Sequence, residues 1–113
     1  MYLDFMSSID FKTKRVDKEK ARKMVRDIVT KSPSQVAFSP HAQEELDNDG
    51  YSIMDGWNVL KSTAAKMTRD GEFENGGFRY RLETNQIALV IQFWSNGKGL
   101  MVITGWAKKG ASR

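Results

Sequence analysis

Three strand-like segments follow one another closely near the C-terminal end of the chain. Residues 78–83 alternate between apolar and polar side chains, residues 87–94 are nearly all apolar, and residues 100–106 are again mostly apolar. Residues 84–86 and 95–99 connect them, and the second connection contains Asn-Gly, the strongest short turn signal in the chain. Connections this short join antiparallel neighbours. The pattern therefore predicts a meander with a central strand covered on both sides.

The N-terminal part of the chain carries helix signals instead. One helix is predicted over residues 16–31 and is capped by Thr13 or Asp17. Its buried face follows from an apolar stripe at helical spacing, made by Ala21, Met24, Val25, Ile28 and Val29. Most lysines and arginines of this segment lie off the stripe. Pro33 ends the helix, because proline disfavours a helical residue before it.

Two further helices are predicted from their start signals. Ser39-Pro40 combines a serine N-cap with proline in the first turn, and a short helix over residues 41–48 follows. Ser52 begins the next helix, with Asp55 three residues on to complete a capping box. This helix is predicted to end near Met67.

The expected fold is α+β, with N-terminal helices packed on a three- to four-stranded antiparallel sheet. Residues 68–71 are predicted to form a turn, and residues 72–75 a short first strand. A length of 113 residues suits one domain, residues 1–113. Within it, residues 1–35 are expected to form an N-terminal arm and a basic helix, and residues 36–108 the core.

Charge is distributed unevenly along the chain. Residues 12–31 carry nine Lys and Arg against three acids, a net charge of +6. Residues 32–60 carry five acids and no Lys or Arg, a net charge of −5. Residues 61–113 carry nine Lys and Arg against four acids, a net charge of +5. Two basic blocks around an acidic one indicate a phosphate-facing surface, although a solvated helix face explains the first block equally well.

The composition argues against several classes of protein. There are no cysteines and one histidine, too few ligands for a typical zinc or Cys-His site. We therefore expect no metal and no cofactor. The N-terminal residues lack the pattern of a signal peptide, and no apolar run approaches a membrane span. A cytoplasmic location and no membrane partner are expected.

His41 and two strand arginines are the candidate catalytic groups. Arg79 and Arg81 are two residues apart on one strand and so point to the same face. Their guanidinium groups match phosphate oxygens, while the imidazole of His41 is a side chain of the type that acts as a general base. Such a set could cleave RNA through attack by the 2′-hydroxyl group. The alternatives are a surface histidine at a helix start and arginines paired with Glu74 or Glu83.

Further residues are candidates for phosphate or base contacts. Thr104 is predicted to share a face with Leu100, Val102 and Trp106, where its hydroxyl group could hold a phosphate oxygen. Strand threonines are also common for their β propensity alone. RNA contacts are predicted, from cationic, amide and aromatic groups, for Lys61, Gln92, Trp94, Trp106, Lys108 and Lys109. The alternative for the tryptophans is that they lie in the core, and for Lys61 that it suits a helix C-terminus. The alternative for Lys108 and Lys109 is a solvated basic tail.

Five segments in one order resemble a small bacterial domain family. They read Phe-Ser-x-His-Ala-x-x-x-Leu at residues 38–46 and Tyr-Ser-Ile-x-Asp-x-x-x-Val-Leu at residues 51–60. A Gly-x-x-Arg-Tyr-Arg strand, an apolar strand and Val-x-Thr-x-Trp at residues 102–106 follow. The family is grouped with the RelE, BrnT and MqsR toxins of bacterial toxin–antitoxin systems, and the match covers about residues 36–108.

The resemblance implies a RelE-like fold and metal-independent cleavage of mRNA, often on the ribosome. The residue types that recur in such toxins are a histidine or basic residue on a helix, an arginine on a strand, and a Ser or Thr on the last strand. Carried over, they are His41, Arg79 or Arg81, and Thr104.

These observations favour a metal-independent endoribonuclease, the toxin of a toxin–antitoxin pair, with RNA and a cognate antitoxin as partners. The alternative is a non-catalytic RNA- or protein-binding module on the same fold, with the basic helix of residues 12–31 as its surface. A third possibility is an interaction protein whose acidic helix meets a basic partner. The oligomeric state is left open.

Overall fold

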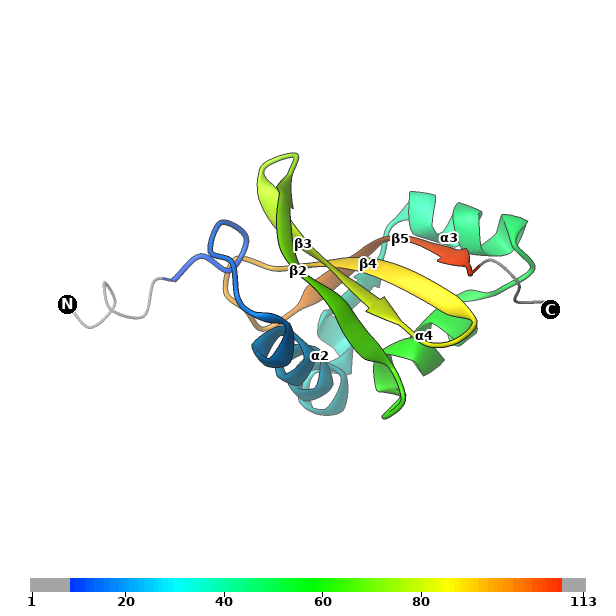
Figure 1. The fold of residues 1–113 in the computed structure, drawn as a ribbon, viewed down its shortest axis with the longest axis horizontal. Coiled ribbons are helices and arrows are strands. Elements are labelled where there is room, and N and C mark those ends of the chain that lie inside the picture. Colours follow the sequence, from blue (N-terminus) through cyan, green and yellow to red (C-terminus); the bar gives the residue numbers. More distant parts are fainter. Residues whose placement is uncertain (1–8, 109–113) are drawn as a thin grey trace.

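Three α-helices and a five-stranded sheet form residues 9–108, the part of the chain that the computed structural model describes (Figure 1). The helices are α2 (Lys18–Lys31), α3 (Pro40–Asn48) and α4 (Ile53–Lys61). The strands are β1 (Val36–Phe38), β2 (Lys66–Glu74), β3 (Gly77–Glu83), β4 (Ile87–Phe93) and β5 (Leu100–Ala107). One turn of 3₁₀ helix, η1 (Pro33–Gln35), precedes β1. The α+β class is confirmed.

The sheet is larger than predicted and mixed. Its strand order is β1-β5-β4-β3-β2, and β2 to β5 form the expected antiparallel meander. β1 adds a fifth strand that runs parallel to β5, with Val36 opposite Leu100. The prediction of three to four antiparallel strands missed β1, because three residues show no alternation and their partner strand lies far along the chain.

Helix starts agree with the predicted caps. The carboxylate of Asp17 accepts a hydrogen bond from the backbone nitrogen of Lys20 (2.8 Å) at the start of α2. The hydroxyl group of Ser39 accepts one from Ala42 (3.0 Å) at the start of α3. Ser52 begins α4 with the predicted capping box. Each cap satisfies backbone donors that the first helical turn leaves free.

The region after α4 was predicted wrongly. α4 ends at Lys61, so the helix expected to reach Met67 is too long. Residues 68–71, predicted as a turn, lie inside β2, where two register shifts accommodate a polar, glycine-containing segment. β2 then turns into β3 through Asn75 and Gly76, whose φ angles are +51° and +86°. Positive φ at both positions is typical of a two-residue hairpin turn.

Arg22 of α2 holds the end of α4. Its guanidinium group donates to the backbone oxygens of Leu60 (3.4 Å), Ser62 and Ala65 (3.2 Å). Carbonyl groups at the end of a helix lack partners within the helix. The long-range contact with α2 therefore stabilises the point at which the chain leaves α4 and approaches β2.

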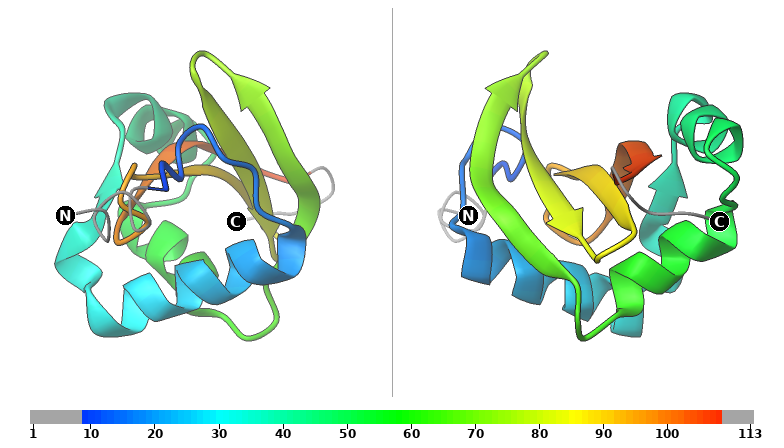
Figure 2. Two further views of the ribbon diagram at one scale, coloured as in Figure 1. Left: turned by 90° about the vertical axis from the view of Figure 1, so that its left-hand side faces the viewer. Right: turned by 45° about the vertical axis from the view of Figure 1, so that its right-hand side comes forward.

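The helices leave one face of the sheet uncovered. α2 and α4 lie under the sheet in Figure 2, whereas α3 runs beside β5, at the opposite edge of the sheet from the β2–β3 hairpin, and both extend upward in these views. The strand side chains that face the helix layer are fully buried or nearly so; they are Tyr80, Leu82, Leu89, Ile91, Phe93, Leu100 and Val102. Ala21 and Val25 of α2 belong to the same core. The basic helix is therefore packed into the core of residues 36–108.

The segment before α2 crosses one end of the sheet. Phe78 donates a backbone hydrogen bond to the oxygen of Lys12 (2.8 Å), and Phe11 donates to Ser95 (2.9 Å). The buried hydroxyl group of Tyr80 accepts a hydrogen bond from the backbone of Val16 at 3.0 Å. Lys12 is thereby fixed beside the start of β3 and the end of β4.

Candidate nucleic-acid interface

A β-bulge in β5 decides which side chains share the uncovered face. Val90 pairs with Thr104, but the next residue of β4, Ile91, pairs with Val102, so Ile103 is an extra residue. Val102 faces the core and Thr104 faces the other way. The prediction that these two residues share a face is wrong, because simple alternation cannot detect an inserted residue.

Side chains from three strands form what we call the open face. Cross-strand partners share a face, so the register gives two transverse rows, Arg81–Val90–Thr104 and Glu83–Ala88–Trp106. At two strand spacings, the backbones of Arg81 and Thr104 are roughly 10 Å apart. Two further pairs, Glu72–Arg79 and Gln92–Met101, also lie on the open face. Five predicted site residues therefore share one face, namely Arg79, Arg81, Gln92, Thr104 and Trp106.

Arg81 lies at the centre of a charged network on this face. Its guanidinium carbon is 5.0 Å from the ring centroid of Trp106, a cation–π distance. One nitrogen is 3.9 Å from the carboxylate of Glu83. That carboxylate also accepts hydrogen bonds from Thr68 (2.7 Å) and binds the ammonium group of Lys108 (2.9 Å). The predicted alternative, an arginine paired with Glu83, is thus what the structure contains.

Glu83 stays ionised in this setting. Burial alone would raise the pKa of its carboxyl group. Hydrogen bonds from Lys108 and Thr68, together with the charges of Lys108 and Arg81, outweigh burial and hold the pKa below its ordinary value. The network therefore combines two cations with one firmly charged acid, which leaves net positive charge on this part of the face.

Arg79 has a buried donor without a partner. Its terminal nitrogen is 3.6 Å from a carboxylate oxygen of Glu74, while its Nε is buried and makes no hydrogen bond. Arg69 of β2 lies nearby and is 3.7 Å from Glu72. A cavity of about 110 Å³ is lined by these four side chains and by Arg81, Tyr80 and Val90. Three guanidinium groups thus meet two carboxylates around one small space.

A second cavity adjoins the open face where the N-terminal segment crosses the sheet. Its volume is about 340 Å³, and its lining includes Lys12, Gln92, Trp94 and Met101. The indole of Trp94 is half-buried and lies against the backbone of Gly99. The predicted grouping of an amide and an aromatic side chain is therefore present, although Trp94 lies just beyond the end of β4.

His41 does not contact the strand arginines. Its ring is 63% exposed, and Nε2 lies 3.9 Å from the carboxylate of Glu45. No hydrogen bond, ion pair or ring contact in residues 9–108 joins it to Arg79 or Arg81. Gln43, about 200° further round the helix, bonds to the oxygen of Phe38 and lines a groove with the start of α4. His41 is therefore an exposed side chain of α3 whose described partner is Glu45.

The predicted lysines do not form one group. Lys61 ends α4 and lies beside Arg26 and Thr30 of α2, on the helix side of the molecule. Lys108 lies at the open face, where it binds Glu83 and donates to the backbone oxygen of Thr84 (3.1 Å). Lys109 falls outside the residues that the structure describes.

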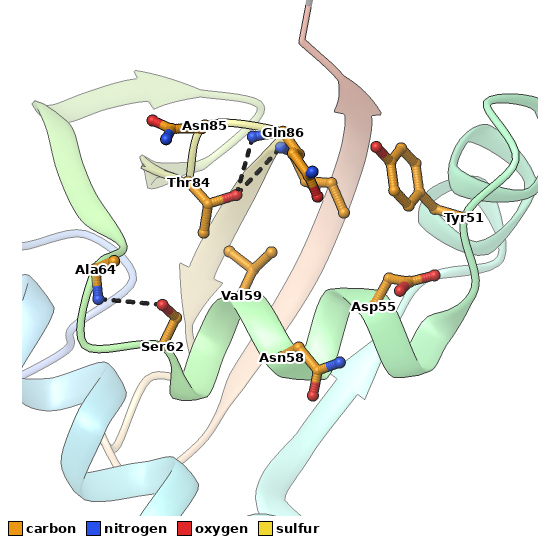
Figure 3. Close-up of a pocket in the computed structure, with 10 residues that line it drawn as sticks. Tyr51, Asp55, Asn58, Val59, Ser62, Ala64, Thr84, Asn85 and Gln86 are labelled. Carbon is orange, nitrogen blue, oxygen red and sulfur yellow. Dashed lines mark hydrogen bonds between the residues drawn. The ribbon is translucent and has the colours of Figure 1, made fainter. Parts of the chain in front are cut away.

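A further cavity, of about 390 Å³, lies between α4 and the β3–β4 turn (Figure 3). Two of its hydroxyl groups serve the local backbone. Thr84 accepts hydrogen bonds from the nitrogens of Gln86 and Ile87, both at 3.2 Å, and Ser62 accepts one from Ala64 at 3.1 Å. None of the predicted site residues lines this cavity. These polar groups shape turns, so the open face is the stronger candidate.

Residues 9–108 show neither a metal-binding cluster nor a membrane-spanning helix. No three His, Asp or Glu side chains in this part of the chain gather as a metal ion would require. None of its helices combines the length and the apolar character needed to cross a bilayer.

Comparison of the chain with protein-family models, with curated proteins and with solved structures finds no match in any of the three. The resemblance to the RelE, BrnT and MqsR toxins therefore stays a prediction from five sequence segments.

Two residues of the site were missed from sequence. Arg69 pairs with Arg81 across β2 and β3, and it was assigned to a turn. The dipeptide Asn75-Gly76 is a hairpin signal that could have extended the first strand back to Arg69. Lys12 had no such signal, because its contact with β3 spans most of the chain.

Proposed function

We propose that this protein binds single-stranded RNA on the open face. The observation that carries the proposal is the contact between Arg81 and the Trp106 ring, with Thr104 in the row beside it. A guanidinium group binds phosphate oxygens in a bidentate manner. An indole offers a stacking surface for a base, and this combination is typical of sequence-tolerant binding to single strands.

The carboxylates on this face do not block phosphate. The contacts of Arg79, Arg81 and Arg69 with glutamates are between 3.6 and 3.9 Å, longer than good hydrogen bonds. The Arg69–Glu72 pair is open to solvent, and such a pair contributes at most about 1 kcal/mol to stability. The Arg79 and Arg81 side chains are more buried, so for them it is the length of the contact that leaves room for another partner. A phosphodiester can therefore replace a glutamate as the partner of an arginine at small cost.

The basic helix is the weaker candidate surface. Arg22, one of its cations, is already bonded to three backbone oxygens at the end of α4. Of the exposed cations of α2, Lys20 lies 5.8 Å from the ring centroid of Phe11, whereas Lys23 and Arg26 have no aromatic group beside them among the ring contacts of residues 9–108. Such side chains provide non-specific attraction rather than a site.

Anisotropy of a fluorescent single-stranded RNA would test the proposal. We expect Arg81→Gln to bind the RNA about tenfold more weakly than the wild type, while Arg26→Gln, an exposed arginine of α2, binds within about twofold of it. Equal losses in both variants would mean that binding follows overall charge, and the open face would be rejected as the site.

A metal-independent endoribonuclease is the second candidate. The observation that favours it is that Arg81 and Thr104 share one row of the open face. His41 would take the 2′-hydroxyl proton, Arg81 would stabilise the phosphorane, and a protonated group would release the 5′ oxygen. The products would carry 2′,3′-cyclic phosphate ends. A toxin role, a cognate antitoxin and a cytoplasmic location belong to this candidate.

Incubation with RNA and excess chelator separates the two candidates. Cleavage that leaves cyclic phosphate ends and disappears in His41→Ala would support the enzyme. RNA that is bound but stays intact, with or without added ribosomes, would leave the non-catalytic binding module.

A further inference from the structure

Two polar groups without partners lie side by side on the open face. The Nε of Arg79 is buried and makes no hydrogen bond. The amide of Gln92 is half-buried and makes no hydrogen bond with any residue from 9 to 108. Tyr80 pairs with Ile91, and Arg79 and Gln92 are the residues that follow this last pair along β3 and β4. Buried polar groups are nearly always paired, so the Nε of Arg79 calls for a partner, while the half-buried amide of Gln92 is open to a ligand or water.

The cavity at Arg79 has the character of a phosphate site. It is about 110 Å³ in volume, roughly the space of four waters, enough for a phosphoryl group and too small for a base. Arg69, Arg79 and Arg81 contribute three guanidinium groups to its lining. Glu72 and Glu74 compete there, but their side chains are 69% and 63% exposed and can turn into solvent.

The cavity at Gln92 has the character of a base site. Its volume of about 340 Å³ is roughly three times larger than that of the arginine cavity. Trp94 supplies an indole for stacking, and Met101 supplies apolar contact. The Gln92 amide offers a donor and an acceptor, the pair that matches the N6 and N7 edge of adenine. Lys12 adds a cation at the rim.

Two glycines allow these side chains to take their positions. A Cβ atom at Gly77 would collide with the amide nitrogen of Gln92. A Cβ atom at Gly99 would lie 2.5 Å from the indole of Trp94. Any other residue at either position would push the polar or the stacking group away, so both side chains depend on a close backbone approach.

We infer that the two cavities form one site for an adenine nucleotide, with its phosphate among the three arginines and its base against Gln92 and Trp94. The inference rests on the proposed RNA-binding function and gives it a preferred nucleotide. The same chemistry is present in free AMP and in an adenosine unit of RNA, and the experiment separates these sources.

The test is calorimetric titration of the purified full chain with AMP, GMP, CMP, UMP, adenosine and inorganic phosphate. We expect AMP to bind about tenfold more tightly than the other nucleotides and more tightly than adenosine or phosphate alone. Oligo(A) and oligo(U) of equal length form the second arm. Tighter binding of oligo(A) than of AMP identifies RNA as the source, whereas the reverse identifies the free nucleotide.

Four variants assign the two parts of the site. Gln92→Leu keeps the size of the side chain and should abolish the preference for AMP, while Asn85→Leu, an exposed amide in the β3–β4 turn, should keep it. Arg79→Lys retains the charge but removes Nε. It should lower the affinity for inorganic phosphate and for AMP by about tenfold. Arg26→Lys is its control on α2. Circular dichroism checks that each variant is folded.

Three outcomes would overturn the inference: equal affinity for all four nucleotides, an AMP preference that survives Gln92→Leu, or phosphate affinity unchanged in Arg79→Lys. RNA binding that is sensitive to Arg81→Gln without any nucleotide preference would reject this site and leave the proposed function intact. Absence of RNA binding would reject the proposed function, and the AMP titration would still decide the site.

Discussion

Arg22 of α2 and Arg81 of β3 are both half-buried, and they use their charge in opposite ways. Arg22 donates to three backbone oxygens, which belong to Leu60, Ser62 and Ala65. Arg81 has one carboxylate at 3.9 Å and one aromatic ring. The first arginine has all its strong partners inside the fold, whereas the second has groups that a ligand can replace.

The difference teaches that a basic residue cannot be assigned to binding from charge alone. Arg22 lies in the most basic segment of the chain, with a net charge of +6 over residues 12–31, yet its guanidinium group closes the end of a helix. Burial, and next the charge of Arg26, lowers the pKa of Arg22. Burial of this kind is tolerated when hydrogen bonds replace water, and it removes the group from the ligand-binding surface.

Loss of Arg22 is predicted to have the largest effect on stability. Arg22→Met should lower the free energy of unfolding by about 2–3 kcal/mol, because backbone oxygens at the end of α4 lose a charged donor. Urea unfolding followed by circular dichroism measures it. Arg26→Met, on the exposed side of the same helix, should change stability by less than about 0.5 kcal/mol. Similar losses in the two variants would show that Arg22 has no special role.

Loss of Arg81 is predicted to affect binding more than folding. Arg81→Gln should lower the affinity for single-stranded RNA by about tenfold, roughly 1.4 kcal/mol. It should change the free energy of unfolding by less than about 1 kcal/mol. Anisotropy and urea unfolding of the same preparation measure both. If Arg81→Gln unfolded as readily as Arg22→Met, the contrast between the two arginines would disappear.

Local signals predicted much of the fold. Caps at Ser39 and Ser52, the stripe of α2 and the three C-terminal strands depend on neighbours within a few residues, and all three kinds of feature are present. The end of α4 was not predictable in this way, because it is stabilised by Arg22 from another helix. β1 also depends on a distant partner, since it pairs with β5.

The candidate site was predictable to a similar degree. Alternation along β3 was enough to put Arg79 and Arg81 on one face, and the register with β4 and β5 supports that expectation. The bulge beside Thr104 has no clear sequence signal, so its face was assigned wrongly. Pairing of the arginines with Glu74 and Glu83 is an alternative that the sequence leaves open, because it depends on how the side chains lie in the folded protein.

Lowering the pH is predicted to reduce the stability of the protein through protonation of Glu83 on the open face. Its pKa in the folded protein lies below the ordinary value, so its ionised form contributes stability above the ordinary carboxyl range, near pH ~4.3. This contribution is lost as the pH falls through the lowered pKa of the folded state. Glu83→Gln should therefore be about 1 kcal/mol less stable than the wild type at pH 7, with the gap closing toward pH 3.

Urea unfolding at the two pH values measures the gap. Glu72→Gln, an exposed carboxylate of β2, is the matched control and should track the wild type. A gap for Glu83→Gln that is equal at both pH values would mean that the lost stability comes from side-chain packing and not from the charge.

Salt dependence gives the smallest and most specific contrast between the two basic regions. Each phosphate contact of a single strand contributes about 0.7 to the slope of the logarithm of affinity against the logarithm of salt concentration. Arg81→Gln should lower that slope by about this amount, because one phosphate partner is lost. Lys23→Gln, an exposed cation of α2, should leave the slope unchanged if the helix stays in solvent. A larger change of the slope in Lys23→Gln than in Arg81→Gln would indicate that the RNA binds to the helix and not to the sheet.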